Sequence, residues 1–296
     1  MAHLASPQLL QRLRGLYPTQ AGNVSHPWYI VTAVAFSASN KPDAAAAVFK
    51  YALEDLETSN TTENLHATKL TVAKKTREAI LQSGLLSGYA RAINSLVALH
   101  GVTPPELQEK SIVRDTNKHL NEVANHGERL FQAMYGNNAA NVQTLLDKVY
   151  PDMGWFSNTV GYGITYGGTD ILTQSESSFV IATANICMDT PRQIAWHLAN
   201  ARNGGATLEE TKAVRQIAME VASTSGVQWT DEVPETCRIL ARLSVEHIFS
   251  NGVSAPLSKT FQVDMCLLVI IGEIHCSREP PSSLEEELVS VTDHIY

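Results

Sequence analysis

Hydrophobic residues recur along much of this chain at the spacing of amphipathic α-helices. The passage from 40 to 57 has Asn40 as a candidate N-cap and Pro42 in the first turn, and its alanines and leucines favour helix. Another helix is predicted from Thr103, because Glu106 follows at the spacing of a capping box. One side of that helix is expected to be buried, since the following residues repeat at helical spacing: Val113, Thr116, Leu120, Val123, Gly127, Leu130 and Met134.

Capping signals predict further helices downstream. Thr173 with Glu176 and Thr207 with Glu210 each form the threonine–glutamate pattern of a capping box. Between them, a helix is expected to start at Thr190 and to stop at the sequence "NGG".

The segment 154–168, "GWFSNTVGYGITYGG", interrupts this helical pattern with glycines and aromatic residues. We expect a loop or short helices that line something there. Strand signals are nearly absent from the sequence. The best candidate, "CLLVIIG" at 266–272, suits a buried helical turn equally well. The predicted fold class is therefore all-α.

The segments 89–99 and 190–201 share a weak internal sequence similarity. A chance match between two helices of similar composition explains it at least as well as a degenerate N-terminal repeat does. We expect a helical first half at 1–130, a core at 131–230 and a helical extension with a tail at 231–296.

Charge and cysteine content narrow the function classes. The chain of 296 residues has a formal net charge of -8, and its lysines and arginines form no stripe, which argues against nucleic acid or an anionic membrane as partner. The four cysteines form no Cys-x-x-Cys pair, and we expect all four to be reduced thiols. With no signal-peptide pattern and a final "DHIY" that is not a peroxisomal address, the expected location is cytoplasmic.

The sequence at 193–214, "QIAWHLANARNGGATLEETKAV", resembles the signature of the carboxymuconolactone decarboxylase and alkylhydroperoxidase-D-like superfamily. The segment 171–186 is similar to the preceding family helix, which begins with a glutamate. The segments 74–99 and 150–168 resemble longer, two-part members that are mostly fungal. The resemblance implies an alkylhydroperoxidase-D-like helical fold, usually oligomeric, with no metal and no organic cofactor.

This chain departs from the peroxidase pattern of that superfamily. Peroxidase members have cysteines where Thr190 and Gln193 stand here, and disulfide cycling needs both thiols. Cys187 lies outside the motif and is interpreted as buried packing. The chain therefore resembles the decarboxylase-like branch.

His197 is the first candidate catalytic residue. It shares helical spacing with Ile194, Leu198 and Ala201, which suits a core histidine bonded to a carbonyl group. The resemblance instead implies general acid–base use, for which an imidazole is suited near neutral pH. Glu176 is the second candidate: the resemblance implies a proton relay to His197, whereas a capping role explains its carboxylate equally well.

The aromatic and polar residues around this motif are candidates for holding a substrate. Aromatic residues amid glycines line a pocket or pack against the core, and an arginine either pairs with a carboxylate or lies solvated at a helix end. Arg192 is considered in the same way as Arg202. The candidate substrate-binding residues are Tyr162, Tyr166, Trp155, Gln193 and Arg202.

His119, Glu122 and His126 could suggest a metal site on one helix. The two imidazoles would stand about 10 Å apart on a straight helix, too far to share one ion, so a solvated face is the better interpretation.

We therefore expect a cofactor-free enzyme of the lyase or isomerase type. It would act on a small unsaturated acid, lactone or related metabolite by decarboxylation or a double-bond shift. The alternatives are a non-catalytic oligomeric or ligand-binding protein on the same fold and, last, a thiol peroxidase using Cys187. The expected partners are a small-molecule substrate and further copies of the chain.

Overall fold

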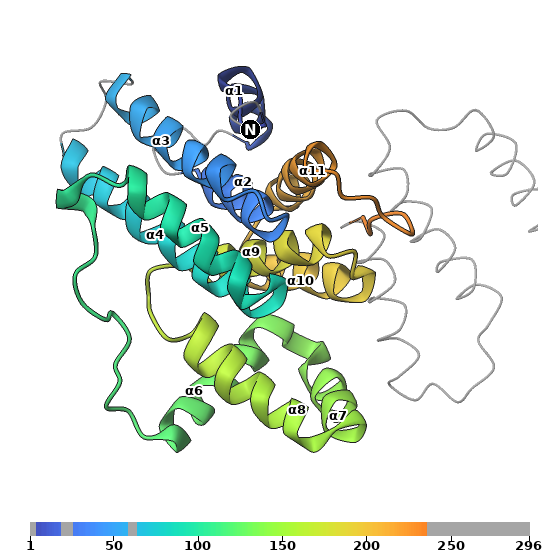
Figure 1. Ribbon diagram of the computed structural model, residues 1–296. Helices are drawn as coiled ribbons and strands as arrows, with labels where there is room; N and C mark the ends of the chain where they lie inside the picture. The colour runs from blue at the N-terminus through green and yellow to red at the C-terminus, as the bar shows by residue number, and fades with distance from the viewer. Residues whose placement is uncertain (1–3, 19–25, 59–63, 236–296) are drawn as a thin grey trace, which may run out of the picture. The chain divides into compact units, whose positions relative to one another are not determined.

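A computed structural model describes residues 4–18, 26–58 and 64–235 of the chain. Every regular element in these ranges is helical and none is a strand, which confirms the all-α prediction (Figure 1). The α-helices are α1 (Pro7–Leu16), α2 (Trp28–Ala38), α3 (Pro42–Thr58), α4 (Leu65–Ser87), α5 (Tyr89–Val102), α6 (Leu120–Tyr135), α7 (Ala139–Val149), α8 (Pro151–Phe156), α9 (Gln174–Cys187), α10 (Pro191–Asn203) and α11 (Leu208–Thr224). The shorter or irregular helices are η1 (Pro105–Leu107), η2 (Gly136–Asn138) and η3 (Ser157–Tyr166).

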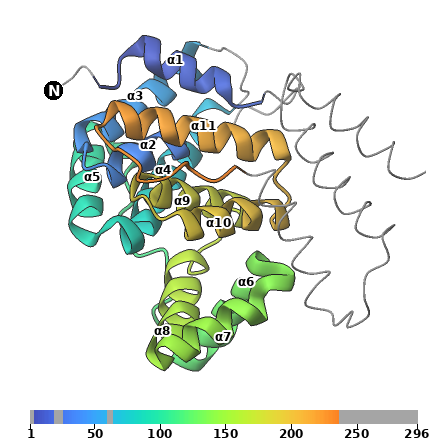
Figure 2. The same ribbon diagram turned by 90° about the vertical axis from the view of Figure 1, so that its right-hand side faces the viewer.

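Two helices are buried along nearly their whole length. All 11 residues of α2 are buried, and its sequence "WYIVTAVAFSA" contains no charged residue. In α9 every residue from Glu176 to Cys187 is buried. A helix that is apolar all round belongs inside a protein. Accordingly, α3, α4, α9 and α11 all pack against α2, and α4, α10 and α11 pack against α9 (Figures 1 and 2).

The predicted capping boxes are both present. The Thr173 hydroxyl accepts from the Glu176 backbone N–H while the Glu176 carboxylate accepts from the Thr173 N–H, and Thr207 and Glu210 do the same at α11. The helix predicted from Thr190 is α10, and it ends at Asn203 as expected from "NGG".

The helix predicted from Thr103 is wrong. Thr103 closes α5, where its hydroxyl donates to the Leu99 carbonyl at 2.7 Å. Only the short η1 follows it, and α6 does not begin until Leu120. The two prolines at 104 and 105 explain the break, because each fixes its own backbone and disfavours helix in the residue before it.

Asn40 also has a different role from the expected N-cap. Its backbone is left-handed, with φ of 56°, and its N–H donates to the Ser37 carbonyl. Asn40 therefore closes α2, as a left-handed residue commonly does, and α3 starts at Pro42.

The glycine- and aromatic-rich segment forms α8 and the π-helix η3. The Gly167 N–H donates to the Tyr162 carbonyl at 2.9 Å, which is the i to i+5 bond of a π-helix. The packing of η3 on α6 is close: a Cβ on Gly127 would lie 1.9 Å from the Asn158 carbonyl oxygen, and one on Gly163 would lie 2.5 Å from that of Val123. Only glycine fits at this crossing. Figure 2 shows α6, α7 and α8 below the hairpin of α9 and α10.

The chain divides by its contacts into 1–234 and 235–296. The expected boundaries at 130 and 230, and the internal repeat, remain predictions. The candidate strand at 266–272 and the expected tail lie outside the described residues. Within the described residues, no helix is both long enough and apolar enough to span a bilayer.

Candidate functional site

His197 lies on α10 inside the protein and is 5% exposed. Its Nε2 atom is 3.4 Å from the Tyr135 hydroxyl, and its Nδ1 atom is 3.4 Å from the side-chain amide of Asn200. Tyr135 is the last residue of α6, whereas Asn200 is one helical turn after His197. The ring therefore has a polar neighbour at each nitrogen.

The Asn200 amide determines which ring nitrogen carries the proton. With its nitrogen facing the carbonyl groups of Met134 at 3.1 Å and Trp196 at 2.9 Å, both of its N–H groups are used. Its oxygen then faces His197 Nδ1 and accepts the Nδ1 proton. His197 Nε2 is left as an acceptor for the Tyr135 hydroxyl, because the hydrogen bond at one nitrogen sets the tautomer of the ring.

Burial determines the charge of this pair. It lowers the pKa of His197 to about 3, so the imidazole is neutral at physiological pH. Burial also raises the pKa of Tyr135 to about 12, although a hydrogen bond with Tyr162 offsets part of that rise. The site thus holds a protonated phenol against a neutral base.

Aromatic rings enclose the pair. Tyr135 lies 4.5 Å from Phe131, 6.1 Å from Tyr162 and 6.0 Å from Trp196, measured between ring centroids. Tyr162 in turn lies 5.4 Å from Tyr166. We call these five side chains and His197 the aromatic cluster.

Two predicted substrate-binding residues, Tyr162 and Tyr166, belong to the aromatic cluster. Both are buried, and burial raises the pKa of each above its usual value. The π-helix η3 turns them inward. Tyr162 reaches His197 only through Tyr135, and the substrate-binding role of the two tyrosines stays a prediction.

Glu176 lies in a different group of side chains. Its carboxylate accepts from the Thr173 N–H and forms an ion pair with Lys75 of α4, with 2.6 Å between Nζ and Oε1. Burial is the cause of the lowered pKa of His197, and the charge of Glu176 acts instead on Tyr17, whose pKa it helps to raise after burial and Glu210. The predicted relay from Glu176 to His197 stays a prediction.

The remaining candidates are spread over the surface of the same region. Trp155 is 54% exposed on α8, and Arg192 is exposed in the first turn of α10. Gln193 follows it and is half-buried. Arg202 donates to the Ala206 carbonyl just beyond the end of its own helix. Within the described part of the chain, none of these four side chains forms a hydrogen bond or an ion pair with the His197 ring.

Cys187 is enclosed at the end of α9. Its Sγ is 3.5 Å from the Ala35 carbonyl oxygen, and burial raises the pKa of the thiol to about 12. A thiol with so high a pKa forms almost no nucleophilic thiolate, which argues against the peroxidase alternative.

The sequence did not indicate Tyr135, Asn200 or Lys75. Tyr135 reaches His197 from α6 and Lys75 reaches Glu176 from α4, and no local pattern in the sequence marks contacts between such distant segments. Asn200 was available as a signal, because it follows His197 by one turn within "HLAN".

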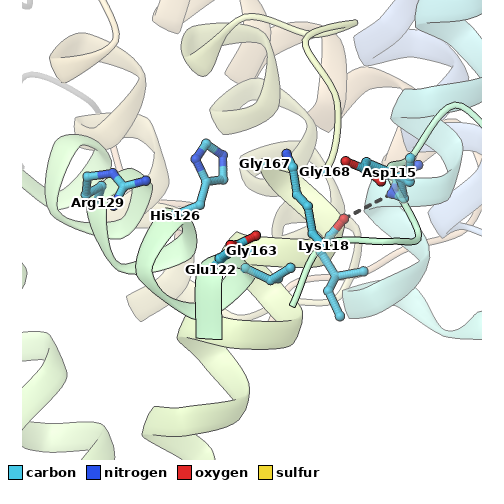
Figure 3. A pocket seen from close by; sticks show the side chains of 11 residues that line it. Asp115, Lys118, Glu122, His126, Arg129, Gly163, Gly167 and Gly168 are labelled. Carbon is cyan, nitrogen blue, oxygen red and sulfur yellow. Dashed lines mark hydrogen bonds between the residues drawn. The ribbon is translucent and has the colours of Figure 1, made fainter. Parts of the chain in front are cut away.

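A surface pocket of about 220 Å³ lies between α6 and η3, and His197 is not among its lining residues (Figure 3). Two members of the rejected metal motif, Glu122 and His126, line it. Among the described residues, no three histidine, cysteine or acidic side chains are close enough together to hold a metal ion.

Two fungal proteins are similar to this chain over most of its length. Peroxisomal protein 2 of Schizosaccharomyces pombe is 28% identical over 226 residues, which are 76% of this chain and 96% of that protein. Peroxisomal protein 2 of Saccharomyces cerevisiae is 26% identical over 289 residues, which cover 79% of this chain and 99% of that protein. No family model matches the chain.

The names of these relatives contradict the expected cytoplasmic location, which is therefore wrong. That expectation was based on the lack of a signal-peptide pattern and on the last residues, "DHIY". A targeting address is recognised by a receptor, and these two patterns do not cover every address that a receptor recognises.

Protonation of His197 is expected to make the protein sensitive to acid. The pKa of a histidine is about 6.5 in an unfolded chain and about 3 for His197 here, so the unfolded state binds more protons between these values. This residue should therefore cost about 1.4 kcal/mol of unfolding free energy for each pH unit below 6.5. Melting temperatures of the wild type and His197→Gln, measured from pH 7.5 to pH 5, should show a shallower decline in the variant.

His100→Gln, at an exposed histidine of α5, is the control and should decline as the wild type does. Parallel declines in all three proteins would contradict the assignment of a buried, neutral imidazole.

Proposed function

We propose that the protein works in the peroxisome as a cysteine-independent member of the carboxymuconolactone decarboxylase and alkylhydroperoxidase-D-like superfamily. In this proposal it catalyses proton transfer at carbon in a small unsaturated acid or lactone. The location is supported by the names of its two relatives. The chemistry is supported by one arrangement, the neutral His197 accepting from a buried Tyr135.

The hydrogen bonds define a route for the proton. As Tyr135 takes a proton from a carbon acid, its own hydroxyl proton passes to His197 Nε2, so His197 is the base and Tyr135 the carrier. Asn200 holds the Nδ1 proton throughout and stabilises the imidazolium that forms. Reversal of the same steps delivers a proton to carbon, as a decarboxylation or a double-bond shift needs.

A negatively charged substrate would make His197 a stronger base. In the free protein, burial lowers the pKa of His197, and no carboxylate among the described residues acts on the ring. A bound carboxylate or enolate would supply the missing opposite charge and raise that pKa towards neutrality. The base would therefore become effective only when an anionic substrate is present.

The aromatic cluster provides the rest of the site. The Tyr162 hydroxyl is a second buried donor next to Tyr135 and would stabilise an enolate oxygen. Trp196 is half-buried and packs against Tyr135, and in this proposal a change in its rotamer would admit the substrate. Gln193 and Arg202 would then hold the acid group of the substrate from α10.

The activity can be tested by hydrogen exchange in D₂O. The full-length protein, incubated with a panel of small unsaturated acids and lactones, should introduce deuterium at carbon or release CO₂ from at least one of them, as followed by NMR. Both His197→Gln and Tyr135→Phe should lower that rate about a hundredfold or more, because each interrupts the proton route. His100→Gln should leave it unchanged. A wild type without activity on the whole panel, or an unaffected His197→Gln, would refute the proposal.

The location can be tested separately. Fractionation of cells that express the native chain, followed with an antibody, should place the protein with peroxisomal marker enzymes. Recovery in the cytosolic supernatant would contradict the proposed location while leaving the chemistry open to its own test.

A specific surface favours the second candidate function, a self-associating protein without catalysis. Tyr89, Ile93 and Val97 form a stripe along α5 and are 80%, 41% and 67% exposed. Leu81 and Leu85 of the adjoining α4 are also exposed. Apolar patches of this kind are uncommon on monomers and mark contact surfaces. We propose a second copy as the occupant, because a face with so little charge suits pairing with itself.

Self-association can be measured by sedimentation or light scattering. The wild type should be a dimer or larger, and Val97→Glu should shift it towards the monomer, since a charge on the stripe would be buried without a partner. Lys148→Glu, at an exposed lysine of α7 outside the stripe, is the control and should keep the wild-type mass. A monomeric wild type would exclude this role for the stripe.

A further inference from the structure

The pocket between α6 and η3 is separate from the aromatic cluster in its lining residues, although both use the same two helices. It is lined by Arg114, Asp115, Lys118, Glu122, Val123, His126, Arg129, Gly163, Ile164, Gly167 and Gly168. Figure 3 shows the side chains of Arg129, His126 and Lys118 along this pocket. A volume of about 220 Å³ suits a small metabolite.

One wall of the pocket is rigid. Arg114 makes two hydrogen bonds to the buried Glu78 carboxylate, at 2.6 and 3.1 Å, and two more to the carbonyl oxygens of Ile164 and Thr165, both at 3.0 Å. Its charge is therefore matched by Glu78. Arg114 holds the loop before α6 against η3 and closes the pocket on that side.

Glycines form another part of the wall. A Cβ on Gly167 would lie 2.8 Å from His126 Nε2, and one on Gly168 would lie 2.8 Å from Arg114 Nε. The absence of side chains at these two positions lets the imidazole and the guanidinium lie directly against the backbone of the segment that follows η3.

The unpaired groups that face this pocket are mostly hydrogen-bond donors. Lys118 and Arg129 carry positive charges and, like the His126 ring, have no partner among the described residues. Glu122 is the opposing carboxylate without a partner, whereas Asp115 accepts from the Asn117 N–H at 3.0 Å. The charges of Lys118 and Arg129 are matched in number by those of Asp115 and Glu122, but Asp115 is already held by a backbone N–H, so the groups left to bind a ligand are mainly the N–H donors of Lys118, Arg129 and His126, which suit an anion.

We propose that this pocket binds a small anion with two or more acidic oxygens, a dicarboxylate or a phosphate. Lys118 and Arg129 bind the anionic oxygens from two sides, and the guanidinium of Arg129 suits a planar pair of oxygens. His126 contributes a ring N–H, and Glu122 limits the affinity by its negative charge. The site is independent of the proton transfer proposed for His197.

Titration of the full-length protein with succinate and, separately, inorganic phosphate tests the site. Binding measured by calorimetry should be accompanied by shifts of the His126 ring signals in the NMR spectrum, and the more strongly bound anion identifies the preferred acid group. Added salt should weaken binding, because the charges are exposed to solvent.

Variants of the lining residues should act in opposite directions. Lys118→Gln and Arg129→Gln should each weaken binding about threefold to fivefold, and Glu122→Gln should strengthen it about twofold, as expected for exposed charges. Lys148→Gln, at an exposed lysine of α7 outside the pocket, should leave the affinity unchanged. All four positions are on the surface, so the folded protein should be retained.

Three results would overturn the proposal. The first is the absence of binding by either anion. The second is binding that Lys118→Gln and Lys148→Gln weaken equally, which would indicate a nonspecific charge effect. The third is weaker binding in Glu122→Gln, which would indicate a pocket for cations.

Discussion

A helix without water around it must satisfy its ends with protein groups, and two such helices, α2 and α9, form the centre of this fold. At the start of α9 the capping box of Thr173 and Glu176 meets this requirement, and Lys75 neutralises the charge that the box brings inside. At its other end, the Trp229 indole donates to the Ile186 carbonyl at 2.8 Å. The Lys75 ion pair also connects α4 to the start of α9.

The same requirement explains why two acid–base candidates predicted together lie in different groups. Glu176 is needed at the start of α9, and its charge pairs with α4. His197 lies on α10, which runs beside α9, and is balanced by neutral groups on α6 and on its own helix. The neutral His197 ring needs only neutral hydrogen-bond partners. Glu176 and His197 are therefore hydrogen-bonded in separate places.

Local signals in the sequence predicted local structure well. Both capping boxes and the start of α10 follow from residues within one turn of each other, and the absence of strands followed from periodicity. The error at Thr103 has a local cause as well: a capping pattern was given more weight than two adjacent prolines. At the site, helical spacing predicts the burial of His197, whereas for Tyr162 and Tyr166 the sequence leaves pocket lining and core packing open. Tyr135 and Lys75 could not be anticipated, because contacts between segments that are distant in the chain leave no mark in one sequence.

The π-helix has a consequence for how this protein can change. Its wider turn places an additional residue between Tyr162 and Gly167 compared with an α-helix. Loss of a single residue from η3 would shift Tyr166 and Gly167 by one position around the helix. Tyr166 would then point away from its ring neighbours, and Gly167 would no longer lie beneath the imidazole of His126. The length of η3 is consequently constrained more strictly than the identity of its side chains. One deletion would disrupt the aromatic cluster and the pocket between α6 and η3 together.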